Sequence, residues 1–302
     1  MLQMTWPDDQ ILDETYVKDL IRYLEKEDDS LGVRSPKNPF RRTLRKLWAL
    51  MTESDYRTKL KAIMLLHHMS TDLGPASSTR VRNHFMRMRE ETNLKNRNEV
   101  YFEQGRLLDV SSSGVPFLPL LKSYGSFTFR RMVAFKGGSQ RLQDALNNKE
   151  TTQAEAVALL HRIDKVICQG TTCKIVRKTS NKITVDIIRL TALDIMNLWR
   201  LYVKGLTKLV KGNYSEEEEV DSETLQELLA QYPVTNDTLR KYLELYGTLV
   251  KDQSMFEDNQ IDLAALEGGA ENACAEEESV GDNGGKEEAE YDHEGGDYDV
   301  YD

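Results

Sequence analysis

Four basic residues close together near the N-terminus have the chemistry to bind phosphate groups. They lie in the segment 38–51, whose apolar residues recur at helical spacing, and they are Arg41, Arg42, Arg45 and Lys46. At 100° per residue, the apolar positions fall on one side of a helix and these cations on the other. An anionic lipid surface contributes about 1 kcal/mol of binding per basic residue. The segment therefore predicts an amphipathic helix with a candidate lipid-binding face, and the alternative is an ordinary solvated helix side.

Other basic residues are weaker candidates for the same chemistry. Lys59, Lys61 and the stretch 174–182, which has no acidic residue, are predicted to support such a face. Arg80 and Arg87 are seven residues apart, as are Arg82 and Arg89, so the two pairs are predicted on faces about 160° apart that do not form one site.

No residue pattern in the sequence indicates catalysis. The chain has no Gly-rich phosphate loop ending in Lys-Ser or Lys-Thr, no His-Glu-x-x-His, no Gly-x-Ser-x-Gly and no Cys-x-x-Cys. His67 and His68 are adjacent, so on a helix they point about 100° apart, and His67 is predicted to be a packed core histidine. We expect no enzyme activity, no catalytic residue, no metal site, no cofactor and no small-molecule substrate.

Charge divides the chain of 302 residues into two parts. Residues 257–302 hold 17 Asp and Glu against one Lys, a net of −16, whereas residues 1–256 hold 39 Lys and Arg against 33 Asp and Glu, a net of +6. The acidic part contains too few apolar residues to order itself, because it cannot bury enough surface. The sequence predicts a helical domain over 1–256 and a disordered acidic tail over 257–302.

Cysteine usage and hydropathy indicate a cytoplasmic protein. The three cysteines are an odd number without paired spacing, as is typical of a reducing compartment. No apolar run approaches the roughly 18 residues that a membrane span needs.

The positions of apolar residues predict helices and no strands. The expected helices cover 13–26, 38–51, 55–74, 77–91, 119–135, 153–168, 184–211, 221–231 and 236–256, with a loop over most of 92–116. The segment around 188–209 is apolar on two sides and is predicted to lie between neighbours. Consecutive helices with short connections predict an all-α fold, either an α-solenoid wound in one direction or the other or a large bundle.

Several segments resemble the ANTH domain of clathrin-assembly adaptors, in that family's order. They are residues 16–21, 55–69, 124–132, 159–167 and 201–206. The most specific is 55–69, Asp-Tyr-Arg-Thr-Lys-Leu-Lys-Ala-Ile-Met-Leu-Leu-His-His-Met, with an aromatic start, a central Lys, an aliphatic run and then His. The resemblance extends over about residues 16–256.

The resemblance implies a right-handed α-helical superhelix (solenoid) of about eight to ten helices with a disordered tail. It also implies binding to phosphatidylinositol 4,5-bisphosphate on the cytosolic leaflet, and a tail that recruits clathrin and other coat or SNARE proteins. The expected function is a clathrin adaptor in endocytosis or vesicle budding, cytoplasmic and peripheral on coated pits or vesicles.

The sequence departs from the family at its N-terminal basic signature. Asp13, Glu14 and Thr15 stand where the family has basic residues, and only Tyr16 matches, so we expect the first helix of the family to be missing or divergent here. Acidic side chains repel phosphate. The expected lipid-binding residues are therefore Tyr16 together with the four basic residues of 38–51.

Two short segments resemble peptides that coat proteins recognise. Residues 263–267, Leu-Ala-Ala-Leu-Glu, resemble a clathrin box, and Leu263, Leu266 and Glu267 are the expected clathrin-binding residues. Residues 38–40, Asn-Pro-Phe, match the tripeptide that Eps15-homology domains bind, but here they are predicted to begin a helix, with Phe40 packed inward.

A different class of function remains open on the sequence alone. A helical scaffold that binds a protein peptide or RNA, and that never meets a membrane, would carry the same basic domain.

Overall fold

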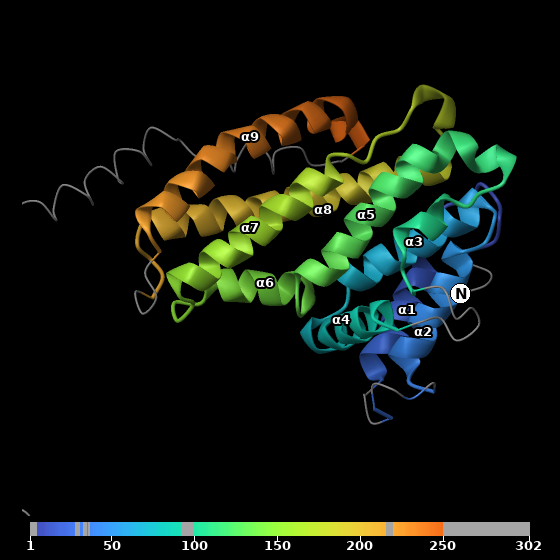
Figure 1. Ribbon diagram of the computed structural model, residues 1–302, viewed down its shortest axis with the longest axis horizontal. Helices are drawn as coiled ribbons and strands as arrows, with labels where there is room; N and C mark the ends of the chain where they lie inside the picture. The colour runs from blue at the N-terminus through green and yellow to red at the C-terminus, as the bar shows by residue number, and fades with distance from the viewer. Residues whose placement is uncertain are drawn as a thin grey trace, which may run out of the picture. The chain divides into compact units, whose positions relative to one another are not determined.

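The computed structural model of the chain is α-helical (Figure 1). It describes residues 5–27, 31–32, 35, 37–91, 100–215 and 220–249. By internal contacts the chain divides into Met1–Ile261 and Asp262–Asp302, and the second unit lies wholly outside the described residues. The described part contains nine α-helices and no strand, which confirms the prediction of an all-α fold with eight to ten helices.

The α-helices follow one another with short connections. They are α1 Glu14–Lys26, α2 Pro39–Met51, α3 Tyr56–Thr71, α4 Pro75–Arg89, α5 Leu118–Ala134, α6 Gly138–Asn147, α7 Gln153–Gly170, α8 Lys182–Val210 and α9 Ser222–Tyr246. Short 3₁₀ helices supplement them: η1 Gln104–Leu108, η2 Ser112–Phe117, η3 Arg177–Thr179 and η5 Gly247–Leu249. Among the described residues, no helix is long and apolar enough to cross a bilayer.

Successive helices pack on one another along the chain. α2 packs against α3, α3 against α5, α5 against α7, and α7 against both α8 and α9 (Figure 1). α4 contacts α2, α5 and α6, and α6 in turn contacts α8. Each helix therefore covers the apolar side of helices that are near it in sequence, as an α-solenoid requires.

The longest helix, α8, lies between neighbours on more than one side. It contacts α3, α6, α7 and α9, and Trp199 in its middle is fully buried. The Trp199 ring stacks on Tyr202 of α8 and on Tyr232 of α9, with ring centroids 5.6 and 5.2 Å apart. This confirms the prediction from its two apolar stripes that 188–209 is buried.

Side chains at the helix starts explain why several boundaries were predictable. Asp55 accepts hydrogen bonds from the backbone of Arg57 and Thr58 at the start of α3, and Asp221 accepts one from Thr224 at the start of α9. Such caps satisfy backbone N–H groups that have no partner within the helix, and each typically contributes about 1 kcal/mol.

Two helices differ from the sequence prediction. α9 continues through Pro233, where two helices were predicted, and α6 was not predicted. Proline removes one backbone hydrogen bond, but Tyr232 and Thr235 on either side of it are buried, so packing holds the helix continuous. α6 begins at Gly138, directly after Gly137, and buries only two leucines, Leu142 and Leu146, which is a weak periodic signal.

Candidate anion-binding surfaces

The α2 helix begins with the Asn-Pro-Phe tripeptide, which has a structural use here. The Asn38 side chain accepts hydrogen bonds from the backbone N–H groups of Phe40 and Arg41 at 3.1 and 3.2 Å. Pro39 occupies the first turn, where its missing N–H is not needed. Phe40 is fully buried, so this confirms the prediction that the tripeptide begins a helix.

Arg41 does not belong to a lipid-binding face, and its assignment there was wrong. Its side chain is 5% exposed and pairs through both terminal nitrogens with the carboxylate of Glu91, just after α4. The hydrogen bond from Arg41 lowers the pKa of Glu91, although burial of the carboxylate acts in the opposite direction. A bidentate pair of this kind fixes how α2 sits against the end of α4.

Three of the four predicted cations on α2 remain available to a partner. Arg42 and Lys46 are exposed and Arg45 is half-buried, and Arg42 and Lys46 form no ion pair with any described residue. We call Arg42, Arg45 and Lys46 the α2 basic face. Glu91 lies near Arg45 as well as Arg41, so it offsets part of the positive charge at one edge.

Tyr16 is exposed on α1, but its helix does not add positive charge to the α2 basic face. The Tyr16 side chain is 47% exposed. Lys18 pairs with Glu14 and Arg22 pairs with Asp19 along the same helix, both at 3.1 Å. Asp13 accepts a hydrogen bond from the N–H of Thr15 and caps α1, so this acidic residue has a structural role.

Lys59 and Lys61 are buried, and the prediction that they support a phosphate-binding face was wrong. The Lys59 ammonium donates to the carbonyl oxygens of Met51 and Arg106 at 2.9 and 3.1 Å. Lys61 donates to the Trp6 carbonyl and pairs with Asp8, which holds the N-terminal segment against α3. Burial lowers the pKa of Lys59 to about 8. Both lysines therefore satisfy backbone groups inside the protein.

The described cations of the basic stretch 174–182 are exposed. Lys174, Lys178 and Lys182 all face solvent. The stretch leads into α8 beside the start of α3, where the Asn181 amide donates to the hydroxyl of Tyr56 at 3.4 Å.

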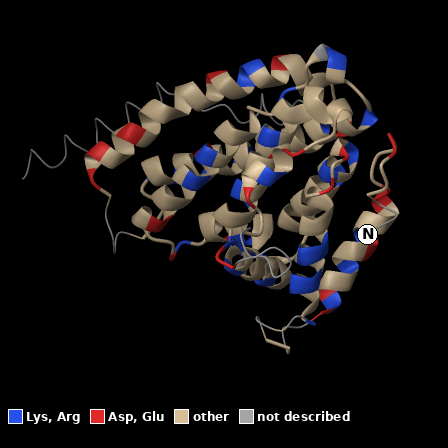
Figure 2. Ribbon diagram, turned by 45° about the vertical axis from the view of Figure 1, so that its right-hand side comes forward, with Lys and Arg blue, Asp and Glu red and all other residues tan. Residues whose placement is uncertain are grey.

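A pocket between α4, α5 and α7 brings together basic residues that are far apart in the sequence. Its cavity volume is about 490 Å³, and Arg89, Arg130, Arg162 and Lys165 line it without any Asp or Glu. Lys and Arg appear on several neighbouring helices in the middle of the helical body (Figure 2). Each cation lies on the polar side of its own helix, so the sequence indicates basic residues on separate helices but not that they converge on one pocket. We call this site the α4–α5–α7 pocket.

A second basic hollow runs along the C-terminal half of α8. Its cavity volume is about 620 Å³, and it is lined by Arg200, Lys204, Lys208 and Lys211. These positions repeat at steps of four and three, so they occupy one face of a single helix. We call them the α8 basic stripe.

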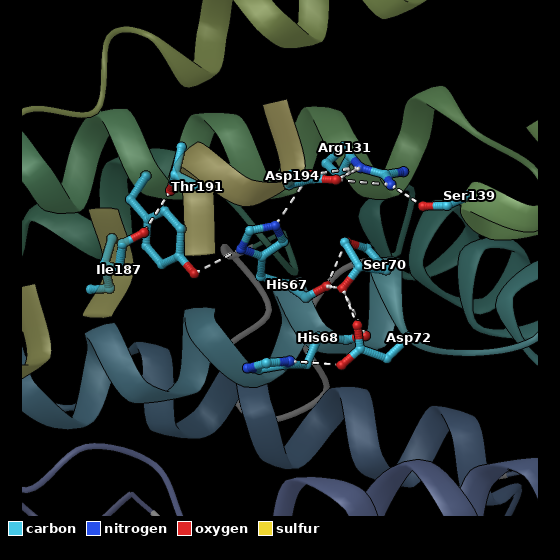
Figure 3. A network of polar contacts seen from close by, with 11 residues as sticks. His67, His68, Ser70, Asp72, Arg131, Ser139, Ile187, Thr191 and Asp194 are labelled. Atoms are coloured by element: carbon cyan, nitrogen blue, oxygen red, sulfur yellow. Dashed lines mark hydrogen bonds and ion pairs between the residues drawn. The ribbon is translucent and has the colours of Figure 1, made fainter. Parts of the chain in front are cut away.

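The most buried polar cluster is structural (Figure 3). Asp194 of α8 lies between Arg131 of α5 and His67 of α3, 2.9 Å from the Arg131 Nε and 3.3 Å from the His67 Nε2. The other ring nitrogen of His67 is 3.0 Å from the Tyr124 hydroxyl. His67 is 3% exposed, which confirms that it is a packed core histidine.

No described group of side chains has the composition of a metal site. Across the described ranges there is no cluster of three or more His, Cys, Asp or Glu residues that could hold a metal ion. The predicted clathrin-binding residues Leu263, Leu266 and Glu267 lie outside the described residues.

No protein-family model matches the chain, and no curated protein matches its sequence.

Proposed function

We propose that this chain is a peripheral membrane adaptor, in which the helical body binds phosphoinositide-containing membrane and the acidic C-terminal segment recruits clathrin. The observation that carries the proposal is the α2 basic face, where Arg42 and Lys46 are exposed although their neighbour Arg41 is buried. Three cations on the polar side of one helix, two of them exposed and one half-buried, supply roughly 3 kcal/mol toward an anionic lipid surface. The resemblance of 16–256 to ANTH domains supports the same function.

Recruitment of clathrin is proposed for the segment 263–267. An extended peptide with apolar residues and a terminal acid adds to a groove on its partner at low ordering cost. Leu263 and Leu266 would supply the apolar contacts and Glu267 the charge.

Co-sedimentation of the full chain with vesicles tests the membrane part. Phosphatidylcholine vesicles with and without phosphatidylinositol 4,5-bisphosphate are compared for the wild type and for the triple variant Arg42→Ala/Arg45→Ala/Lys46→Ala. We expect the wild type to prefer the phosphoinositide vesicles and the variant to bind about 100-fold more weakly at low salt. A control that removes three exposed charges from the α8 basic stripe, Arg200→Ala/Lys204→Ala/Lys211→Ala, should bind nearly as the wild type does.

Two results would contradict this proposal. One is a wild-type chain that ignores phosphoinositide, and the other is a control variant that loses more binding than the α2 variant. The clathrin part is tested separately, since Leu263→Ala/Leu266→Ala should abolish capture of purified clathrin while leaving vesicle binding unchanged.

A further inference from the structure

The α4–α5–α7 pocket concentrates positive charge that no described acidic residue neutralises. Arg89 comes from α4, Arg130 from α5, and Arg162 and Lys165 from successive turns of α7. All four side chains are exposed, and none of them forms an ion pair with a described Asp or Glu. By contrast, Arg131, the neighbour of Arg130 on α5, is paired with Asp194. The pocket therefore holds unpaired positive charge that three helices contribute.

A fifth cation, Arg82, extends the same cluster. Arg82 lies two helical turns before Arg89 on α4, and its Nε donates to the carbonyl of Val133 at 2.8 Å. Burial lowers the pKa of Arg82, and the neighbouring charge of Arg162 lowers it further. Like charges held this close raise the free energy of the protein without a ligand, and a bound anion relieves that repulsion.

The walls of the pocket suit a small polyanion better than an extended chain. The cations converge from three helices around apolar side chains that include Phe129 and Val166, while Gln104, Ser126 and Gln169 add neutral hydrogen-bonding groups. A volume near 490 Å³ falls within the range of about 300–1,000 Å³ that small-molecule sites occupy.

We propose that the α4–α5–α7 pocket binds a multiply phosphorylated small ligand of the size of an inositol trisphosphate, either free in solution or as the headgroup of a lipid. Three phosphate monoesters carry roughly five negative charges at pH 7. Five cations stand in or beside the pocket to meet them. Arginine forks bind phosphate oxygens in pairs, which gives the site orientation as well as attraction.

The α8 basic stripe has as many cations but a different geometry. Its four cations come from one helix face, and Lys208 already donates to the carbonyl of Leu146 at 3.0 Å. A line of charges on one helix attracts anions without surrounding them. It therefore provides the matched control, because it offers equal charge without convergence.

Binding of inositol 1,4,5-trisphosphate to the full chain, measured by isothermal titration calorimetry, tests the proposal. The variant Arg130→Ala/Arg162→Ala removes two exposed pocket cations, and Arg200→Ala/Lys204→Ala removes two exposed cations from the stripe. We expect the pocket variant to bind about 10- to 100-fold more weakly and the stripe variant to bind as the wild type does. Thermal unfolding of both variants without ligand should match the wild type, and the trisphosphate should raise the melting temperature of all but the pocket variant.

A vesicle arm identifies the source of the phosphates. If Arg130→Ala/Arg162→Ala also weakens binding to phosphatidylinositol 4,5-bisphosphate vesicles, the ligand is a lipid headgroup; if only soluble binding falls, it is a free polyphosphate. Both results support the site. The calorimetric measurement with the soluble trisphosphate does not depend on membrane attachment through α2. A negative result there would overturn the pocket proposal and leave the adaptor proposal standing, and failure of vesicle binding through α2 would leave the pocket proposal standing.

Three results would overturn the proposal. The first is a wild-type chain that does not bind the trisphosphate, and the second is equal loss of binding in the pocket and stripe variants. The third is a pocket that binds single-stranded RNA or a phosphopeptide in preference to the trisphosphate, since these need an extended surface.

Discussion

Replacing Asp194 with Asn removes the negative charge that faces Arg131 inside the helical body. The Arg131 side chain is fully buried and that of Asp194 is 7% exposed. Arg131 donates from Nε to Oδ2 at 2.9 Å and from a terminal nitrogen to Oδ1 at 3.2 Å, and its guanidinium lies over the Phe135 ring, 4.8 Å from the centroid. Asparagine keeps the shape of aspartate but leaves the arginine charge buried without a counterion.

The pKa of Asp194 sets a lower bound on the effect. Burial alone would raise it, but the charges and hydrogen bonds of Arg131 and His67 bring the pKa down to about 2. A carboxyl with a lowered folded pKa contributes stability that is present above its unfolded pKa and lost as pH falls toward 2. The shift corresponds to about 2 kcal/mol. Breaking a buried pair costs more, about 3–5 kcal/mol, because the remaining arginine also loses its partner.

Urea unfolding at pH 7, followed by far-UV circular dichroism, measures the loss. We expect Asp194→Asn to lower the free energy of unfolding by about 3–5 kcal/mol. The double variant Arg131→Met/Asp194→Leu should recover most of it, because no buried charge remains. The exposed Asp237, paired with Lys241 at 2.7 Å on α9, is the control, and Asp237→Asn should change stability by less than about 0.5 kcal/mol. A loss below about 1 kcal/mol for Asp194→Asn would refute the reasoning.

Two more buried ions give predictions that stability measurements can check. Glu91→Gln leaves Arg41 without its counterion and should lower the free energy of unfolding by about 2–3 kcal/mol, since Glu91 is partly exposed. The control variant Glu90→Gln changes an exposed neighbour and should have little effect. Equal losses of stability in the two variants would contradict the pairing of Glu91 with Arg41. Because burial lowers the pKa of Lys59 to about 8, the unfolded chain retains a proton that the folded chain releases, so stability should rise between about pH 8 and 10. Relative to Lys59→Met, the wild type should gain about 2–3 kcal/mol over that window, and parallel pH curves for the two proteins would count against the assignment.

Helix periodicity and capping residues carried enough information to predict most of the helices. α2 and α3 begin next to Asn38 and Asp55, as the sequence predicted, because a helix cap depends only on residues within one turn. The sequence prediction was wrong about the helix around Pro233 and about α6 because it used only such local information. Whether a helix survives a proline or a short apolar pattern depends on the neighbours that bury it.

The candidate sites were less predictable than the helices. Arg41 is about 20° from Trp48 around the α2 axis, so its position at the edge of the apolar side was a local indication of its burial. Lys59 and Lys61 donate to Arg106 and Trp6, which are remote in the chain, so the spacing within α3 did not indicate these contacts.

The sequence by itself determined that this protein is helical and that its charge is divided between a basic body and an acidic C-terminal segment, because both properties follow from local composition and spacing. Only the tertiary structure decided which cations face solvent. Helix packing buries Arg41 against Glu91, fifty residues away, and brings Arg89, Arg130 and Arg162 from three helices around one pocket. Burial and convergence depend on contacts between distant segments, and the spacing within one helix does not specify those contacts.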